Sequence, residues 1–312
     1  MADRKLKKRI VWIITIPIFL ILLLFVILQF RAKGYIENLL NQKIPDHIHL
    51  TYGQLEVNLI KGSVGLTDVV LEILDKEARI SKMGMRLEAI DLNGLGYYQA
   101  LFGNTINFRE IRLLRPKTEY YQGGHGVDNG EVTEYDSTTE KILSVAQLSI
   151  VDGKFTILGK SRDTVVFSME NLNFSLDNLK LNRETIEGEI LFSYGDYDLN
   201  TGTVYADLGP YEALTLSGTT IKDNELQLSN LSLKSKYDKT TLSKKLDKEH
   251  DYIDLEIPEL NLSGMDFGFS AGRFFLIATS LNLQKPNIEI FRDKLVQDDY
   301  EQKKLYSRML RE

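Results

Sequence analysis

The sequence predicts an all-β protein held by a single N-terminal transmembrane helix. Two observations predict this fold. A charge-free apolar run stands near the start of the chain, and about a dozen segments follow in which apolar and polar residues alternate with a period of two. Few segments with helical periodicity lie between them, and consecutive strands joined by short links favour antiparallel pairing.

The membrane anchor is predicted from residues 10–28, IVWIITIPIFLILLLFVIL, which hold no charged side chain. At about 1.5 Å per residue, such a helix spans close to the ~30 Å hydrocarbon core of a bilayer. Five basic residues precede the run and two follow it closely, which places the N-terminus in the cytoplasm. We therefore expect a cytoplasmic tail at 1–9, a transmembrane helix at 10–30 and the rest of the chain outside the cytoplasm.

A cleaved signal peptide is the alternative interpretation of this run. The apolar core of a signal peptide is usually ~7–15 residues long and ends at a cleavage site of small residues. Here the run is longer, and its end, LLLFVILQFRAKG, lacks a small-x-small site. The sequence therefore favours an uncleaved anchor.

The composition excludes several classes of function. The 312 residues include no cysteine, which excludes a disulfide framework, a thiolate metal site and a thiol nucleophile. Residues 1–33 carry a net charge of +6, so a whole-chain charge of −6 leaves −12 for the remainder. Nucleic-acid binding relies on Lys and Arg that neutralise phosphates, and an acidic outer domain argues against it.

The rest of the chain divides by periodicity. We expect a juxtamembrane helix at 31–45, stopped by Pro45, and a first β segment at 46–121. A polar, glycine-rich stretch at 122–140 predicts a flexible surface loop and a domain boundary. A second β segment follows at 141–291; its charged stretch 234–251 is expected to be a loop or a short solvated helix. Residues 292–312 predict an amphipathic helix, and the missing helix-ending signal suggests the front part of a longer protein.

Three stretches share one layout, in which a strand, a short kink and a second strand follow one another. INFREIRLLRPKTEYY at 106–121 and FLIATSLNLQKPNIEIF at 275–291 each place a basic residue and proline at the kink. LSVAQLSIVDGKFTIL at 143–158 has Asp152-Gly153 there instead. Repeated units of this kind suit an elongated sheet that grows by adding similar pieces.

The apolar face of such a sheet needs a cover, and the sequence offers no set of amphipathic helices for it. Two arrangements remain open at this point. A second sheet packs on the first and closes a β-sandwich, or the sheet curls on itself and another molecule fills its trough.

The chain also resembles a known family. The single N-terminal transmembrane helix, the short helix after it, LTYGQLEVNLIKGSVGLTDVVLEI at 50–73 and the later strand-proline-strand units are similar to the AsmA-like bacterial envelope proteins, which include TamB. The resemblance implies a bent, taco-shaped sheet with an apolar groove, anchored in the bacterial inner membrane and projecting into the periplasm. It also implies lipid transport or outer-membrane biogenesis, with no catalytic residues and no cofactor. Members are often longer, with further β repeats toward the C-terminus.

An acyl chain offers no directional chemistry, so its carrier needs a continuous apolar stripe, and burial of each CH₂ contributes ~0.8 kcal/mol. One face of a strand provides such a stripe. The expected ligand is a phospholipid or another acyl lipid, and envelope proteins are possible partners. The alternative interpretation of the same residues is an ordinary sandwich core. The candidate lipid-binding residues are Leu172, Phe174, Leu176, Ile186, Ile190, Phe192, Leu226, Leu228, Leu255 and Ile257.

Other chemical candidates are weaker. Asp46, His47 and His49 stand close enough in sequence to bind a metal, but no further ligand cluster lies nearby, so we interpret them as solvated. His125 and the glycines at 123–126 do not follow a strand and open a helix as a phosphate-binding loop does. No hydrolase or nucleotide-binding motif occurs. We therefore expect no enzyme; a membrane-tethered scaffold and an envelope hydrolase remain the alternative hypotheses.

Overall fold

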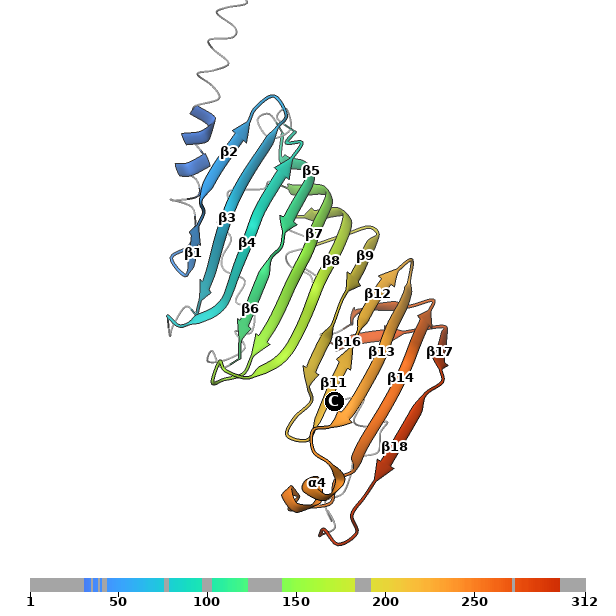
Figure 1. Ribbon diagram of the computed structural model, residues 1–312. Coiled ribbons are helices and arrows are strands. Elements are labelled where there is room, and N and C mark those ends of the chain that lie inside the picture. Colours follow the sequence, from blue (N-terminus) through green and yellow to red (C-terminus); the bar gives the residue numbers. More distant parts are fainter. Residues whose placement is uncertain are drawn as a thin grey trace, which may run out of the picture.

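The computed structural model describes residues 31–34, 36–38, 40, 44–75, 79–96, 103–122, 142–182, 192–270 and 273–297. The fold is mostly β, with one mixed sheet of 16 strands and a separate two-stranded sheet (Figure 1). Within these ranges, no helix is both long enough and apolar enough to cross a bilayer. The predicted anchor at 10–30, most of the loop at 122–140 and the end of the predicted C-terminal helix, 298–312, lie outside the described residues.

The strands of the large sheet are β1 (Ile48–Thr51), β2 (Gln54–Asn58), β3 (Ser63–Leu74), β4 (Ser81–Asn93), β5 (Thr105–Leu114), β6 (Lys117–Tyr121), β7 (Ile142–Leu158), β8 (Val165–Leu181), β9 (Tyr197–Thr201), β10 (Val204–Asp207), β11 (Glu212–Leu216), β12 (Gly218–Lys222), β13 (Glu225–Ser235), β14 (Tyr252–Ser263), β17 (Ser280–Gln284) and β18 (Asn287–Phe291). The small sheet consists of β15 (Asp266–Ser270) and β16 (Arg273–Ile277). Helix α4 (Lys239–Lys245) lies inside the charged stretch 234–251, and Asp238 caps its N-terminus. Residues 31–34, 36–38 and 40 are also helical, whereas 292–297 form no helix.

Short strands of the large sheet join in pairs to form long ribs. β1 and β2 both pair with β3, and β17 and β18 both pair with β14. In the same way β5–β6, β9–β10 and β11–β12 each act as one interrupted strand. The large sheet therefore consists of eleven ribs, each beside the next in chain order, and Figure 1 shows them side by side in one twisted layer.

One neighbouring pair of ribs is parallel, which differs from the antiparallel sheet expected from the sequence. β5–β6 and β7 run in the same direction, from Thr105 opposite Ile142 to Tyr121 opposite Leu158. Parallel strands need a connection of a dozen residues or more, whereas antiparallel strands can be joined by two. Residues 122–141, nearly all of them in the stretch predicted to be a flexible surface loop and a domain boundary, supply that length. The pairing instead joins the two predicted β segments in one sheet.

A line of backbone irregularities crosses the sheet at the middle of the ribs, and we call it the crease. Its residues with positive φ are Asp68, Arg115, Asp152, Asn171, Asn230 and Lys285. Neighbouring ribs contact one another along it: Asn171 Nδ2 donates to Asp152 Oδ1 at 3.1 Å, and Asn230 Nδ2 donates to Ser217 Oγ at 2.9 Å. Asn and Asp adopt left-handed backbone conformations more readily than most other residues. The kinks predicted at 115–116, 152–153 and 285–286 are confirmed, and the structure places all three on this line.

The crease keeps apolar side chains on one face of the sheet. On β3, Leu66 and Val69 are both buried although they stand three residues apart, because the left-handed Asp68 shifts the alternation by one position. On β4 the same shift separates Leu87 from Ile90, which pair with Val69 and Leu66. Each rib can therefore bend and still present the same face on both sides of the bend.

Replacing Asp68 tests the crease. Asp68→Val is expected to lower the free energy of unfolding by about 1–3 kcal/mol, because a β-branched residue is strained at a φ of 51°. Asp68→Gly is expected to lie within about 0.5 kcal/mol of the wild type, because glycine adopts this conformation without strain. Urea unfolding followed by circular dichroism measures both. Equal destabilisation by the two variants would mean that the Asp68 side chain, not the backbone geometry, is what matters.

The best-packed core lies at the N-terminal end of the sheet. Leu55, Leu66, Val69 and Leu87 form a buried cluster there. Ile36 and Leu40, from the helical residues that precede the sheet, pack against this cluster. Within the helix predicted at 31–45, these two residues therefore cover a part of the first ribs, whereas the described residues 44 and 45 are not helical.

Candidate functional site

Side chains of neighbouring ribs form an unbroken apolar row from one edge of the sheet to the other. Residues that are partners across strands point to the same face, so the row follows from the pairing register. Every member is Leu, Ile or Phe. This upper row consists of Leu55, Leu66, Ile90, Leu113, Ile150, Phe174, Leu199, Ile221, Leu226, Leu262 and Leu281.

A second row crosses the same eleven ribs on the other side of the crease. At about 4.8 Å for each step between strands, each row is about 48 Å long. This lower row consists of Ile48, Ile73, Met83, Tyr120, Ile157, Phe167, Ala206, Leu214, Leu233, Leu255 and Ile288.

Both rows lie on one face. Leu66 of the upper row and Val69 belong to the same buried cluster, so they point to the same face. Val69 lies beyond the crease residue Asp68, four positions before Ile73 of the lower row, and residues an even number of positions apart on a strand share a face. We call this side of the sheet the apolar face and the opposite side the polar face. The apolar face is a continuous surface of hydrocarbon side chains, and few of its positions carry a polar group.

Exposure of the apolar face changes along its length. Leu55 and Leu66 are buried at the N-terminal end, and the row members from β4 to β14 are half-buried. At the last rib, Leu281 and Ile288 are 59% and 57% exposed. A large share of this hydrocarbon therefore remains accessible to solvent or to another molecule in the part of the chain that the structure describes.

The β15–β16 hairpin leaves the large sheet between β14 and β17 and packs toward the apolar face. The ring of Phe267 on β15 lies edge-on to Tyr197 on β9, with 5.6 Å between ring centroids. Tyr197 is the partner of Leu176 across β8 and β9, and burial raises the pKa of its hydroxyl. Met265, just before the hairpin, is buried. The hairpin thus covers a part of the apolar face, as Ile36 and Leu40 do at the other end.

The structure brings seven of the ten predicted lipid-binding residues onto this sheet. Phe174 and Leu226 belong to the upper row, and Leu255 belongs to the lower row. Leu172, Leu176, Leu228 and Ile257 lie on the same three strands. Phe192 precedes β9, is 36% exposed and contacts the ring of Tyr194. Ile186 and Ile190 lie outside the described residues.

The structure also adds residues that sequence reasoning did not select. Leu199 and Ile221 connect Phe174 to Leu226 in the upper row. Leu199 stands alone among polar neighbours in the segment YDLNT, so its strand showed no alternation of several apolar residues. The only feature of the sequence that indicates the face of Leu199 is its spacing of two residues from Tyr197. The pairing of Leu199 with Phe174 shows that its side chain lies on the apolar face.

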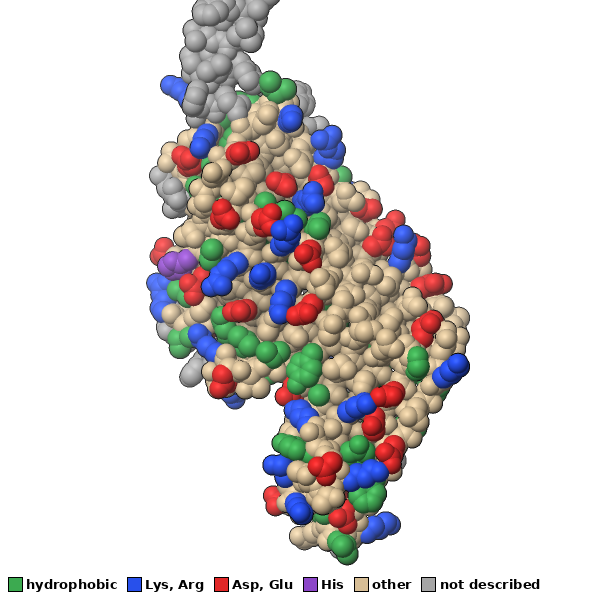
Figure 2. Space-filling view, viewed as in Figure 1, with side chains coloured by type: hydrophobic (Ala, Val, Ile, Leu, Met, Phe, Trp, Pro, Cys, Tyr) green, Lys and Arg blue, Asp and Glu red, His purple; other side chains and the backbone are tan. Residues whose placement is uncertain are grey.

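The polar face carries interspersed charges. Figure 2 shows acidic and basic side chains mixed over the face turned to the viewer. Several form pairs between neighbouring ribs, including Lys154 with Glu170 at 2.7 Å and Arg115 with Glu88 at 2.5 Å. Exposed pairs of this kind contribute about 1 kcal/mol or less to stability. Their mixture keeps this side of the sheet hydrated and gives it no single sign of charge.

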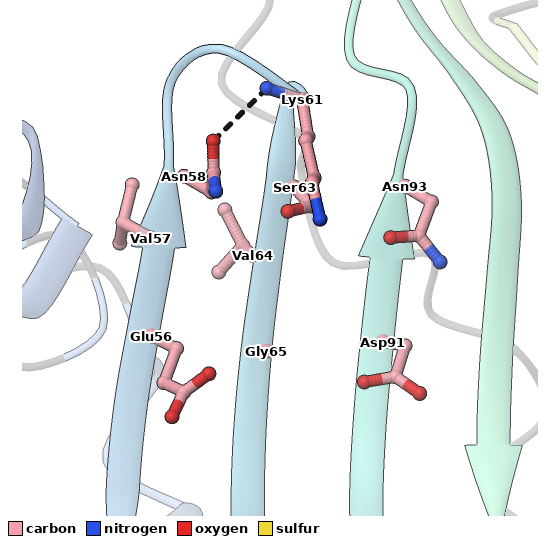
Figure 3. A pocket seen from close by; sticks show the side chains of 9 residues that line it. All are labelled: Glu56, Val57, Asn58, Lys61, Ser63, Val64, Gly65, Asp91 and Asn93. Carbon is pink, nitrogen blue, oxygen red and sulfur yellow. Dashed lines mark hydrogen bonds between the residues drawn. The ribbon is translucent and has the colours of Figure 1, made fainter.

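A pocket of about 420 Å³ lies over β2, β3 and β4. Figure 3 shows Glu56 and Asp91 on either side of Gly65, whose lack of a side chain leaves the hollow between them. Asn58, Lys61, Ser63 and Asn93 complete much of its lining. This lining is polar and suits water better than hydrocarbon, so the pocket is separate from the apolar rows.

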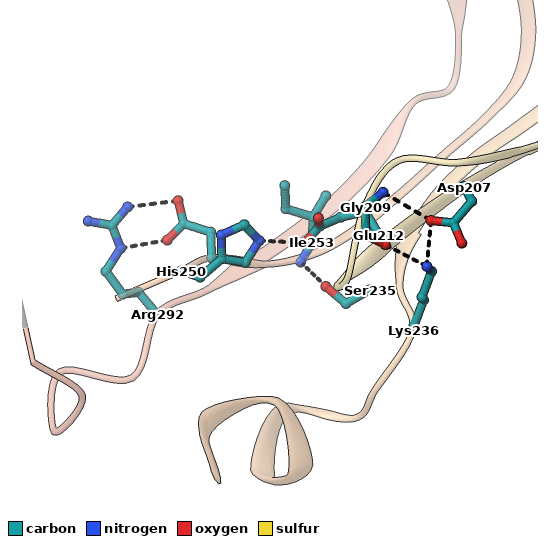
Figure 4. Close-up of polar contacts among 9 residues, drawn as sticks. Asp207, Gly209, Glu212, Ser235, Lys236, His250, Ile253 and Arg292 are labelled. Carbon is teal, nitrogen blue, oxygen red and sulfur yellow. Dashed lines mark hydrogen bonds and ion pairs between the residues drawn. The ribbon is translucent and has the colours of Figure 1, made fainter. Parts of the chain in front are cut away.

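Polar contacts tie together the ends of several ribs near α4 (Figure 4). Lys236 Nζ lies 2.6 Å from Asp207 Oδ1. The hydrogen bonds from Lys236 and from the Gly209 N–H hold the pKa of Asp207 below its ordinary value. Arg292 contacts Asp251 through two nitrogens, at 2.5 and 2.8 Å, and these contacts raise its pKa. Lys236 and Arg292 are thus both paired with carboxylates, so we interpret these contacts as stabilising the ends of the loops.

His250 is the histidine with the closest acidic partner among the described residues. Its Nε2 lies 2.5 Å from Glu212 Oε1, and its ring contacts Tyr211. No group of three or more potential metal ligands occurs in the described ranges, which include His47 and His49. His125 lies outside them.

Comparisons with protein-family models and with curated proteins find no match for this chain. The class of the protein therefore rests on its own geometry. It is a mostly β protein whose large mixed sheet has one polar face and one apolar face.

Proposed function

We propose that the apolar face is a curved β-groove that binds the acyl chains of a phospholipid or another lipid. Two unbroken rows of eleven apolar residues support this proposal, because hydrocarbon chains need a continuous stripe and no directional contacts. A closed sandwich would need a second sheet of similar size. The described residues form only the two-stranded β15–β16 sheet beside the large one.

We further propose that the protein is a single-pass inner-membrane protein with a cytoplasmic N-terminus and a periplasmic sheet. The charge-free run at 10–28 and the basic residues before it support the anchor and its orientation. Ile36 and Leu40 pack on the first ribs, so a helix that continues from the membrane would place the N-terminal end of the groove next to the acyl chains of the bilayer. The resemblance to AsmA-like proteins points to lipid transport or outer-membrane biogenesis as the process.

Photocrosslinking from two adjacent positions tests lipid binding. The full-length chain is produced in bacterial membranes with p-benzoylphenylalanine at Phe174 on the apolar face or at Ser175 on the polar face. Ser175 is a matched control, because successive residues of a strand point to opposite faces. Irradiation is expected to add a lipid mass to the Phe174 variant, and mass spectrometry of the purified protein detects it.

The Ser175 variant is expected to show little or no lipid adduct. Equal labelling at both positions would indicate non-specific contact with membrane lipid. No adduct at Phe174 or at the more exposed Phe192 would contradict the groove and favour a membrane-tethered interaction module.

A further inference from the structure

The last rib of the sheet, β17–β18, has one neighbour within the described part of the chain. Among the described strands it pairs with β14 alone. Its apolar-face residues are more exposed than their counterparts on interior ribs: Leu281 is 59%, Leu283 39%, Ile288 57% and Ile290 60% exposed. Unpaired backbone groups and exposed apolar side chains at a sheet edge form a template for another strand.

This edge rib repeats an interior rib of the same chain. Residues 280–291 align with residues 110–121 of β5–β6 without a gap, and the kinks fall on Arg115-Pro116 and Lys285-Pro286. The two basic residues have the same backbone conformation, with φ values of 46° and 44°. The inner neighbours also match in register. Leu114 and Lys117 pair with residues 89 and 86 of β4, just as Gln284 and Asn287 pair with residues 259 and 256 of β14.

The interior rib β5–β6 shows which kind of strand pairs with the outer side of such a kink. There β7 pairs with β5–β6 in parallel and brings its own kink, Asp152-Gly153, opposite Arg115-Pro116. Arg115 N donates to Val151 O at 2.8 Å, and Pro116 O accepts from Lys154 N at 2.7 Å. Arg115 Nε also lies 3.8 Å from Asp152 Oδ2.

The corresponding groups of the edge rib lack these partners. Neither Lys285 N nor Pro286 O makes a backbone hydrogen bond with any residue in the described ranges. The Lys285 side chain likewise forms no ion pair with a described residue, whereas Arg115 has one on each side. The edge therefore offers a donor, an acceptor and a positive charge in the arrangement that, elsewhere in this molecule, binds a strand with an aspartate at its kink.

We propose that the β17–β18 edge binds, in parallel orientation, a strand of another polypeptide that resembles β7. Such a strand alternates apolar and polar residues and carries an Asp-Gly kink at its centre. Its apolar side chains extend the upper and lower rows by one position, and its aspartate faces Lys285. Docking by strand addition then lengthens the apolar face beyond the eleven ribs of the described sheet.

A peptide that corresponds to β7, KILSVAQLSIVDGKFTILGK (residues 141–160), provides the probe. The chain contains no cysteine, so single cysteines introduced on the polar face report the register. Arg112 pairs with Ser149 and Glu119 with Thr156 in the interior interface. By the alignment, Asn282→Cys should form a disulfide with the Ser149→Cys peptide, and Glu289→Cys with the Thr156→Cys peptide.

The crossed combinations are expected to give at least tenfold less disulfide. Residues 149 and 156 of an extended peptide lie about 23 Å apart, and a disulfide requires Cα atoms within about 7 Å. The experiment uses the full-length chain in detergent micelles under mild oxidation. Glu56→Cys on β2, the rib at the opposite edge of the sheet, serves as the matched control and should not react above background.

Four results would overturn the proposal. Preferential reaction in the crossed combinations would show antiparallel docking, and equal reaction at Glu56→Cys would show that the peptide adheres to any free edge. A disulfide between the Asn282→Cys and Glu289→Cys variants, mixed without peptide, would show that two copies of the chain pair edge to edge. Absence of every crosslink would also contradict it.

Discussion

Replacing Phe174 with glutamate is expected to reduce the lipid bound per protein at least tenfold. Phe174 is the middle member of the upper row, so the new carboxylate would interrupt the apolar face halfway along its length. Moving a carboxylate against hydrocarbon costs several kcal/mol, and 1.4 kcal/mol already corresponds to a tenfold loss of affinity. Quantitative mass spectrometry of lipid extracted from the purified full-length chain measures the change.

Two variants control for effects on folding and on local packing. Ser175→Glu places the same charge on the polar face and should leave the bound lipid within about twofold of the wild type. Phe174→Leu keeps the apolar character and should also stay close to the wild type. Wild-type lipid content in Phe174→Glu, with an unchanged circular dichroism spectrum, would mean that acyl chains do not lie on the upper row.

Replacing Val69 with aspartate is expected to unfold the N-terminal ribs. Val69 is 1% exposed in its cluster with Leu55, Leu66 and Leu87. Ile36 and Leu40 pack against this cluster. The substitution removes a buried apolar side chain and buries an unpaired charge, which together cost more than about 4 kcal/mol. Loss of the cooperative urea transition, followed by circular dichroism, is the expected result.

The neighbouring residue supplies the control. Val70 carries the same side chain but is 40% exposed on the opposite face of β3. Val70→Asp is therefore expected to change the free energy of unfolding by about 1 kcal/mol or less. Similar destabilisation by the two variants would contradict the assignment of one apolar and one polar face to this strand.

The alternation of apolar and polar residues predicted much of this fold. Strands were expected around Leu66, Leu148, Phe174 and Leu228, and the structure has them in β3, β7, β8 and β13. The basic-proline and Asp-Gly kinks were also visible, because proline fixes φ and Asp-Gly favours tight backbone geometry. These signals are local, so they can be read from neighbouring residues alone.

The pairing partners were not visible in the same way. Phe174 and Leu199 lie side by side although 25 positions separate them, and nothing in either segment specifies the other. The parallel contact of β5–β6 with β7 was missed for the same reason. The β15–β16 hairpin was missed as well: the alternation continues from Phe275 to Leu283, yet β16 leaves the large sheet and β17 returns to it.

By itself the sequence determined that this chain alternates as strands, bends at specific residues and keeps one side of each strand apolar, because these properties depend on side chains a few positions apart. Only the tertiary structure decided that eleven ribs share one register. It also decided that their kinks form one crease and that the apolar sides join into two rows of eleven residues. The physical reason is that register is set by hydrogen bonds and packing between segments that are distant in the sequence. A shift of one residue in the pairing would move every side chain of a strand to the opposite face of the sheet.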